Sequence, residues 1–143
     1  MRVAIVYDSA TGTTKAAAEQ MGEVTRAAGH ECSVDSIHDA DPANVSAADA
    51  ICVGSWTKGL YVIRQAPTQA TIDFIERLEP LDGKQTAVFT TYALAVGKML
   101  TKMATALEAR GAAVTGRFKS KGPSASTDFA TWLRRLETGP RRA

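Results

Sequence analysis

A hydroxyl-rich turn, Ser9-Ala10-Thr11-Gly12-Thr13-Thr14, lies between an apolar run at residues 3–7 and a stretch with helical periodicity. It brings four hydroxyl groups, one glycine and a row of backbone N–H groups to the start of a helix. Unpaired N–H groups and the helix dipole together favour an anion at such a position. The turn itself contains no Lys or Arg. It is therefore predicted to hold, mainly through neutral groups, the phosphate of a cofactor that stays bound.

Two other phosphate-binding motifs do not fit the sequence. A P-loop requires G-x-x-x-x-G-K-[ST], but Gly12 has no glycine five positions before it, and Gly97-Lys98 is followed by Met99. The dinucleotide fingerprint G-x-G-x-x-G does not occur either. An alternative without any ligand stays open, in which Ser9 and Thr11 only cap the helix.

The composition is that of a globular protein with one domain. The chain has 143 residues, of which 45% are hydrophobic and 22% charged. No apolar run approaches the roughly 20 residues of a membrane span, and the N-terminus enters a strand-like run directly, unlike a signal peptide. Cys32 and Cys52 are too few for a disulfide framework. We therefore expect a monomeric cytoplasmic protein without a membrane partner.

The charge pattern argues against nucleic acid as a partner. The formal net charge is only +2, and the basic residues are not interleaved with aromatic ones in a stripe. Nucleic-acid binding requires a more concentrated basic footprint. His30 and His38 have no neighbours with metal-ligand spacing, so no metal site is predicted and both histidines are expected to be exposed.

Strand and helix patterns alternate along the whole chain. The predicted strands lie at 3–7, 31–37, 50–54, 86–90 and 113–118, and the helices begin near Thr13 and cover 71–78, 96–107 and 129–136, with a short helix after Asp41-Pro42. The first, third and fourth strands are continuously apolar, as in parallel strands covered on both faces, whereas the other two are mixed like edge strands. This pattern predicts a single α/β domain over residues 1–143. Its doubly wound, five-stranded parallel sheet has the order 2-1-3-4-5 in a three-layer sandwich.

Ligands of such sheets bind beyond the carboxyl ends of the strands, where the strand order reverses. The loops predicted at that place are 8–14, 55–68 and 91–97. The second contains Trp56 and Tyr61, and the third contains Tyr92. A flat heteroaromatic ring could stack between such side chains. The alternative is that these aromatic residues only pack against neighbouring helices.

Two further interpretations of the sequence are less favourable. Residues 52–58 run from a cysteine to a lysine, whereas a small tyrosine-phosphatase loop requires Cys, five residues and then Arg. Lysine cannot replace the bidentate fork of arginine on an oxyanion, so Cys52 is predicted to be a buried apolar residue. A receiver domain needs an acidic pair after its first strand; Asp8 alone is interpreted as a turn or cap residue.

With these loops in place, the chain resembles the flavodoxin family, in its short-chain type. The family's phosphate motif S-x-T-G-x-T is present as Ser9, Thr11, Gly12 and Thr14. The resemblance implies FMN as the cofactor. The residues that it implies for binding are Ser9, Ala10, Thr11, Gly12, Thr13 and Thr14 for the phosphate, Ser55, Trp56, Thr57, Lys58 and Gly59 on one side of the isoalloxazine, and Thr91, Tyr92 and Ala93 on the other. Either Trp56 or Tyr61 would cover the ring.

The resemblance also implies a mechanism. The peptide of Gly59 would turn to offer a carbonyl to the flavin N5, because glycine adopts either sign of φ freely. The third loop lacks the acidic residue common in the family, and basic residues stand around the expected ring, at Lys58, Arg64, Lys98 and Lys102. A rim with so little acidic character predicts a second reduction potential less negative than in acidic relatives.

The function implied is that of a low-potential carrier rather than an enzyme. It would shuttle single electrons from a flavodoxin-reductase-type donor to an acceptor redox protein. The alternative is a small FMN-dependent reductase or oxidase that acts directly on a quinone, a nitro compound or a porphyrin. A third hypothesis is an interaction domain that keeps the fold without a flavin.

Overall fold

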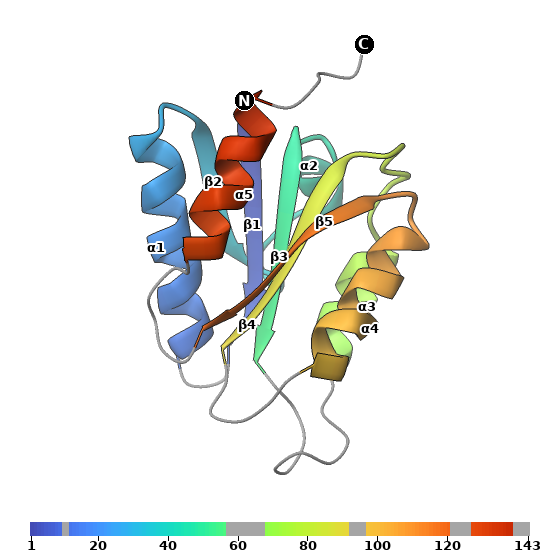
Figure 1. Ribbon diagram of the computed structural model, residues 1–143. Helices are drawn as coiled ribbons and strands as arrows, with labels where there is room; N and C mark the ends of the chain where they lie inside the picture. The colour runs from blue at the N-terminus through green and yellow to red at the C-terminus, as the bar shows by residue number, and fades with distance from the viewer. Residues whose placement is uncertain (10–11, 57–67, 92–96, 121–126, 139–143) are drawn as a thin grey trace.

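The computed structural model describes residues 1–9, 12–56, 68–91, 97–120 and 127–138, which form a three-layer α/β sandwich (Figure 1). The strands are β1 (Arg2–Asp8), β2 (Glu31–Ser36), β3 (Ala50–Trp56), β4 (Gln85–Thr91) and β5 (Ala113–Ser120), and the helices are α1 (Thr13–Ala27), α2 (Pro42–Ser46), α3 (Gln69–Glu76), α4 (Gly97–Glu108) and α5 (Thr127–Thr138). All strand pairs are parallel, in the order β2-β1-β3-β4-β5. The predicted fold class and strand order are confirmed.

The sheet is covered by helices on both faces. α1 and α5 pack on one face, and α2, α3 and α4 pack on the other, as Figure 1 shows for the larger helices. The sheet has a hydrophobic core on each face, and alternate residues of β1 point into one or the other. Val3 and Ile5 face α1 and α5, whereas Ala4 and Val6 face α3 and α4. The central strands are therefore apolar at nearly every position, which is why their continuous runs identified them.

The two edge strands differ from the central ones in burial. Exposed and half-buried residues alternate along the whole of β2. In β5, Gly116 and Phe118 are buried while Arg117 and Lys119 are exposed. This alternation confirms the prediction that the second and fifth strands lie at the edges of the sheet.

The helix ends follow local capping chemistry. α1 ends before Gly29, whose φ of +91° is a left-handed conformation that glycine adopts without strain. α3 begins at Gln69 rather than at the predicted residue 71, because the Thr68 side chain accepts a hydrogen bond from the Thr71 N–H at 3.3 Å. None of the described helices is both long enough and apolar enough to cross a membrane.

One close approach constrains the middle of the sheet. Gly54 of β3 pairs with Phe89 of β4, and a Cβ atom at position 54 would lie 2.1 Å from Cζ of that ring. A side chain at position 54 would therefore displace the phenyl ring, which belongs to the core under α1 and α5. The glycine lets the aromatic ring lie flat against the backbone just before β3 reaches its carboxyl end.

Candidate functional site

The carboxyl ends of β1, β3 and β4 bring the predicted loops together. The hydroxyl oxygens of Thr14, in the first turn of α1, and Thr91, at the end of β4, lie 2.7 Å apart in a hydrogen bond. Their exposed fractions are 1% and 7%, so the contact is internal. The structure therefore joins the first predicted loop directly to the third.

The turn before α1 is closed by its own serine. Ser9 Oγ accepts a hydrogen bond from the Gly12 N–H at 3.0 Å, and Gly12 has a φ of +90°. Gly12 occupies the N-cap position, so no side chain at that position accepts from the first turn of the helix, and that turn contains no acidic residue. α2 and α3 differ, since Asp41 and Thr68 cap them. Ser9 therefore closes the turn rather than capping the helix.

The uncapped start of α1 fits an anion. A helix N-terminus carries partial positive charge and orphan N–H groups, which in the other two helices are partly satisfied by a capping oxygen. Thr13 is half-buried in the same first turn. The Thr14 hydroxyl can accept from Thr91 and still donate its own hydrogen to an oxyanion. Ala10 and Thr11 lie outside the described residues.

Asp8 does not behave as the sequence suggested. It was expected to be a turn or cap residue, but it is the last residue of β1 and is only 8% exposed. Its carboxylate accepts a hydrogen bond from Thr68 Oγ1, and His38 Nε2 lies 3.6 Å from the other carboxylate oxygen. The chain returns at the start of α3 to the end of β1, and there it buries the Asp8 carboxylate and supplies it with a hydrogen-bond donor.

The second predicted loop is anchored at both of its ends. Ser55 is fully buried, and its hydroxyl oxygen accepts from the Thr68 N–H at 3.1 Å. The Thr90 hydroxyl donates to the Ser55 carbonyl at 2.8 Å. Ser55 therefore ties the start of the loop to its return and to β4. Thr68 carries no assigned role in the sequence prediction, although a threonine three residues before Thr71 is a typical cap signal.

The aromatic positions are only partly described. Trp56 ends β3 and is half-buried, which is compatible with an aromatic side chain at the rim of a crevice. The other ring-side candidates, Thr57, Lys58, Gly59, Tyr61, Tyr92 and Ala93, lie outside the described residues. Their roles stay predictions.

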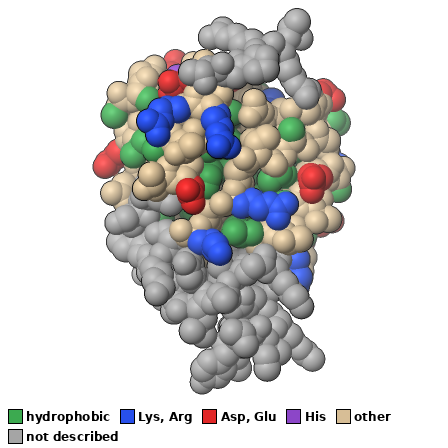
Figure 2. Space-filling view, in the orientation of Figure 1, with side chains coloured by type: hydrophobic (Ala, Val, Ile, Leu, Met, Phe, Trp, Pro, Cys, Tyr) green, Lys and Arg blue, Asp and Glu red, His purple; other side chains and the backbone are tan. Residues whose placement is uncertain are grey.

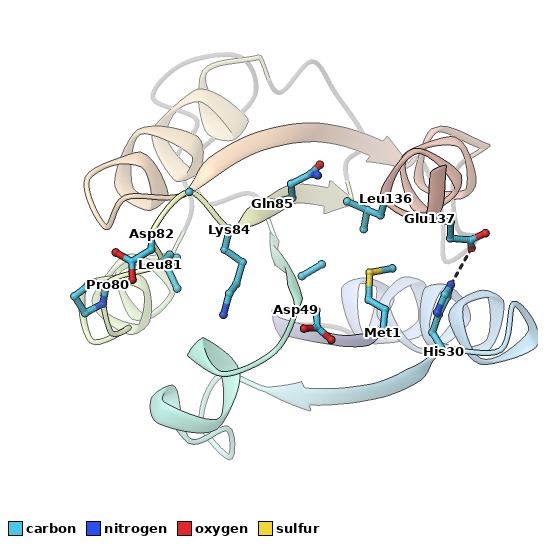
Figure 3. Close-up of a pocket in the computed structure, with 12 residues that line it drawn as sticks. Met1, His30, Asp49, Pro80, Leu81, Asp82, Lys84, Gln85, Leu136 and Glu137 are labelled. Atoms are coloured by element: carbon cyan, nitrogen blue, oxygen red, sulfur yellow. Dashed lines mark hydrogen bonds and ion pairs between the residues drawn. The ribbon is translucent and has the colours of Figure 1, made fainter. Parts of the chain in front are cut away.

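A hollow of about 840 Å³ lies at the amino ends of the strands, opposite the candidate site (Figure 3). It is lined by Met1, His30, Asp49, Ala50, Pro80, Leu81, Asp82, Gly83, Lys84, Gln85, Leu136 and Glu137. Several of its polar groups already have protein partners: Asp49 accepts from the Arg2 N–H at 2.7 Å, and Lys84 Nζ donates to the Ser46 carbonyl. Ligands of doubly wound sheets bind at the carboxyl ends of the strands, so this hollow does not coincide with the predicted site.

Both histidines can now be assigned. The prediction that His30 is exposed is wrong: its side chain is 14% exposed, and Nε2 lies 2.9 Å from Glu137 Oε1 (Figure 3). The pair joins the end of α1 to α5, two elements that only the folded chain brings together. The side chain of His38 is 66% exposed, as predicted. Among the described residues, no cluster of three or more His, Cys, Asp or Glu could hold a metal ion.

Cys52 is confirmed as a buried apolar residue. It is 0% exposed, and burial raises the pKa of its thiol well above the ordinary value. A cysteine nucleophile acts as the thiolate, which this environment disfavours. The structure therefore gives no support to a phosphatase-like role for Cys52.

Comparison with protein families gives one match. The family model described as Flavodoxin matches residues 5–134, which is most of the chain. No curated protein sequence matches the chain.

Solved structures agree with the family match. The two-electron reduced flavodoxin of Megasphaera elsdenii is 25% identical, with a TM-score of 0.78 over 92% of this chain and 95% of that one. The flavodoxin of Streptococcus pneumoniae TIGR4 is 20% identical, with a TM-score of 0.76 over 98% and 100% of the two chains. Oxidised flavodoxin 1 of Bacillus cereus is 22% identical, with a TM-score of 0.70 over 94% and 93%. The last two likenesses show the shared fold.

Proposed function

Because this chain belongs to the flavodoxin family, we propose that it binds FMN at the carboxyl ends of β1, β3 and β4 and carries single electrons between redox proteins. The observation that carries the proposal is the N-terminus of α1, which no side chain of the described residues caps, at the point where the strand order reverses. That is where a doubly wound sheet binds the phosphate of a nucleotide-like ligand.

The described residues fit the phosphate end of FMN. Gly12, Thr13 and Thr14 would present backbone N–H groups and two hydroxyls to a dianion without any neighbouring carboxylate in the first turn. Ser9 would keep the turn closed through its contact with the Gly12 N–H. Ala10 and Thr11 complete the same turn in the sequence. Binding through neutral groups suits a cofactor that is retained between reactions.

The remaining residues would surround the ring. Trp56 or Tyr61 on one side and Tyr92 on the other would cover its faces and exclude water, with Thr57, Lys58, Thr91 and Ala93 beside them. Ser55 would support this arrangement, because its hydrogen bond to the Thr68 N–H holds the two ends of the second loop together. The Gly59 carbonyl would accept a hydrogen bond from the flavin N5 when that atom carries a proton.

The chemistry itself belongs to the cofactor. Bound FMN accepts and releases electrons singly, and the protein sets the potentials through the groups around the ring. We propose a reductase-type donor and an acceptor redox protein as partners, with the chain acting as a monomer. The basic residues Lys58, Arg64, Lys98 and Lys102 would stabilise the negative charge that accumulates on full reduction.

The test is reconstitution followed by reductive titration. Added FMN should lose its fluorescence on binding at a one-to-one ratio, and riboflavin, which lacks the phosphate, should bind more weakly. During anaerobic titration with dithionite, a long-wavelength absorption band should rise and then decay, as expected for two separate one-electron steps.

Each other outcome contradicts a defined part of the proposal. Binding of FMN followed by a single two-electron step would favour a reductase that acts directly on a quinone, nitro compound or porphyrin. Equal affinities for FMN and riboflavin would remove the phosphate role of the first turn. Absence of binding would leave a flavin-free interaction domain.

A further inference from the structure

The small net charge conceals a strong separation of charge along the chain. Residues 97–143 carry ten Lys and Arg against three Asp and Glu, whereas residues 1–96 carry seven against twelve. The first group includes α4 and β5, which lie at one edge of the sheet, and α5, which packs beside α1; β2 forms the opposite edge. The last third of the sequence is therefore basic and the part before it acidic.

The edge strands themselves show the same polarity. In β5 the exposed positions include Arg117 and Lys119, and in β2 they include Glu31 and Asp35. Charged side chains on edge strands prevent other chains from pairing there. Charges of the same sign on both edge strands prevent such pairing best, because edges of opposite charge attract two copies of the protein to one another. Edge protection alone therefore does not explain the pattern.

The basic side chains of β5 extend toward α4. Arg117 Nη1 donates to Thr101 Oγ1 at 3.4 Å, which places the guanidinium beside the helix that carries the exposed Lys102. Among the described residues, Lys102, Arg117 and Lys119 form no ion pair with Asp or Glu. Figure 2 shows one side of the molecule, on which Lys and Arg side chains lie with some Asp and Glu side chains between them. These three residues are called the β5 basic face below.

The β5 basic face borders the candidate cofactor site. Lys119 lies opposite Thr90 in the sheet register, and the next residue lies opposite Thr91, the partner of Thr14. A protein that contacted this face would therefore bring its own redox centre toward the carboxyl end of β4, where the third loop begins.

We propose that the β5 basic face is the docking surface for the acidic face of a redox protein partner. The proposal rests on the proposed electron-carrier function and adds the charge of the partner and the place where it binds. Opposite charges would steer the encounter and weaken as salt screens them. The chemistry favours carboxylates of a protein over nucleic acid, because Phe118, which stands between Arg117 and Lys119, is buried and the face offers only a small number of cations.

The experiment uses two haem proteins as probes, acidic cytochrome b5 and basic cytochrome c. The FMN-loaded, dithionite-reduced protein should reduce cytochrome b5 at a rate that falls with ionic strength. The double variant Arg117→Glu/Lys119→Glu should lower that rate roughly tenfold or more at low salt, within the range of electrostatic steering. The same variant should accelerate reduction of cytochrome c.

The control is Arg77→Glu. Arg77 is exposed at the end of α3, near the opposite end of the sheet from the cofactor site, and its replacement by Glu makes the same change of charge as each of the two substitutions in the double variant. It should leave the low-salt rate nearly unchanged. If the double glutamate variant does not fold, Arg117→Gln/Lys119→Gln tests the same face with a smaller change.

A second readout does not depend on the flavin. Oxidised cytochrome b5 added to the isotope-labelled protein should shift NMR resonances of β5 and α4 at low salt, whether or not FMN is bound. If the NMR shifts occur but the protein does not carry electrons, only the proposed carrier function is overturned. The docking surface is overturned if FMN is reduced normally but the NMR shifts are absent. It is also overturned if Arg77→Glu slows the reduction of cytochrome b5 as much as the double glutamate variant does.

Two further outcomes identify a different occupant. Tight binding of a single-stranded DNA oligonucleotide at physiological salt, without binding of cytochrome b5, would assign the face to nucleic acid. Concentration-dependent self-association in sedimentation, abolished by Arg117→Glu/Lys119→Glu, would assign it to the acidic β2 edge of a second copy. Either result would overturn the proposal.

Discussion

The Thr14 and Thr91 hydroxyls form a buried hydrogen bond between residues 77 positions apart. One of them lies in the first turn of α1 and the other ends β4, so the contact fixes the distance between the two loops proposed for the phosphate and the ring. Because each hydroxyl can donate and accept, Thr91 can orient the Thr14 hydrogen toward a ligand.

The variant Thr14→Val should weaken FMN binding about tenfold and riboflavin binding much less. The substitution removes a donor near the phosphate and leaves the Thr91 hydroxyl unpaired inside the protein, which costs about 1–3 kcal/mol. Fluorescence titration with both flavins measures the two affinities. Thr25→Val is the matched control, because Thr25 is also buried in α1, where its hydroxyl donates to the Met21 carbonyl and makes no contact with Thr91. Equal effects on both flavins would show that Thr14 acts on the fold alone.

The variant Thr68→Val should loosen the second loop. The Asp8 carboxylate would lose its hydroxyl donor in a buried setting, at a cost of about 2 kcal/mol. Trypsin can cut after Lys58 and Arg64, which lie between the two ends of the loop. Cleavage there should be faster in Thr68→Val than in Asp8→Asn, which keeps an oxygen to accept the bond. Unchanged cleavage in both variants would contradict an anchoring role.

The variant Gly54→Ala should destabilise the fold by about 1–3 kcal/mol, the usual result of overpacking a core. The added methyl would overlap the Phe89 ring, because a Cβ atom at this position would lie 2.1 Å from Cζ of the ring. Urea unfolding would measure the loss. Combining the substitution with Phe89→Leu should recover part of the stability, since the smaller side chain leaves room. Additive losses in the double variant would show that the clash is not with Phe89.

The free energy of unfolding should fall in alkaline solution. Burial raises the pKa of Cys52 well above its ordinary value, and burial also raises the pKa of Cys32. The unfolded thiols therefore ionise first, near their ordinary value of 9.0, and each proton lost favours the unfolded state. Stability is complete below that pH and declines as the pH rises beyond it. In Cys52→Ala, urea unfolding at increasing pH should show a shallower decline, and an identical decline would contradict the assignment.

The variant Lys58→Glu should make the second reduction potential more negative. The substitution replaces a positive charge in the loop proposed beside the ring by a negative one, which disfavours the anionic reduced state. Spectroelectrochemical titration of the FMN-loaded protein gives both potentials. Arg77→Glu, at the far end of α3, should shift them little. An unmoved second potential in Lys58→Glu would count against the basic rim.

The fold was predictable because its signals are local. The continuous apolar runs of β1, β3 and β4 and the mixed pattern of β2 and β5 identified the strand order, and Gly29 marked the end of α1. Each of these signals depends on burial or on the conformation of a single residue. The contacts within the site depend instead on how distant segments meet.

Two examples show this limit. Asp8 accepts from Thr68, 60 positions away, and His30 pairs with Glu137, 107 positions away. Both contacts form only when the crossover connections bring distant segments together. The sequence around Asp8 or His30 therefore does not identify the partner residue. The motif Ser9-x-Thr11-Gly12 was visible in the sequence, whereas the residues that support it were not.

The hydrogen bonds of Ser55 to Thr68 and Thr90 also bear on how this scaffold could be re-engineered. Both ends of the second loop are held by side chains that belong to strands or to a helix cap, outside residues 57–67. A transplanted segment of another length would then meet the same attachment points, and doubling its length would add only about 0.6 kcal/mol of closure entropy. The segment can be treated as an exchangeable cassette for setting the redox properties of the protein.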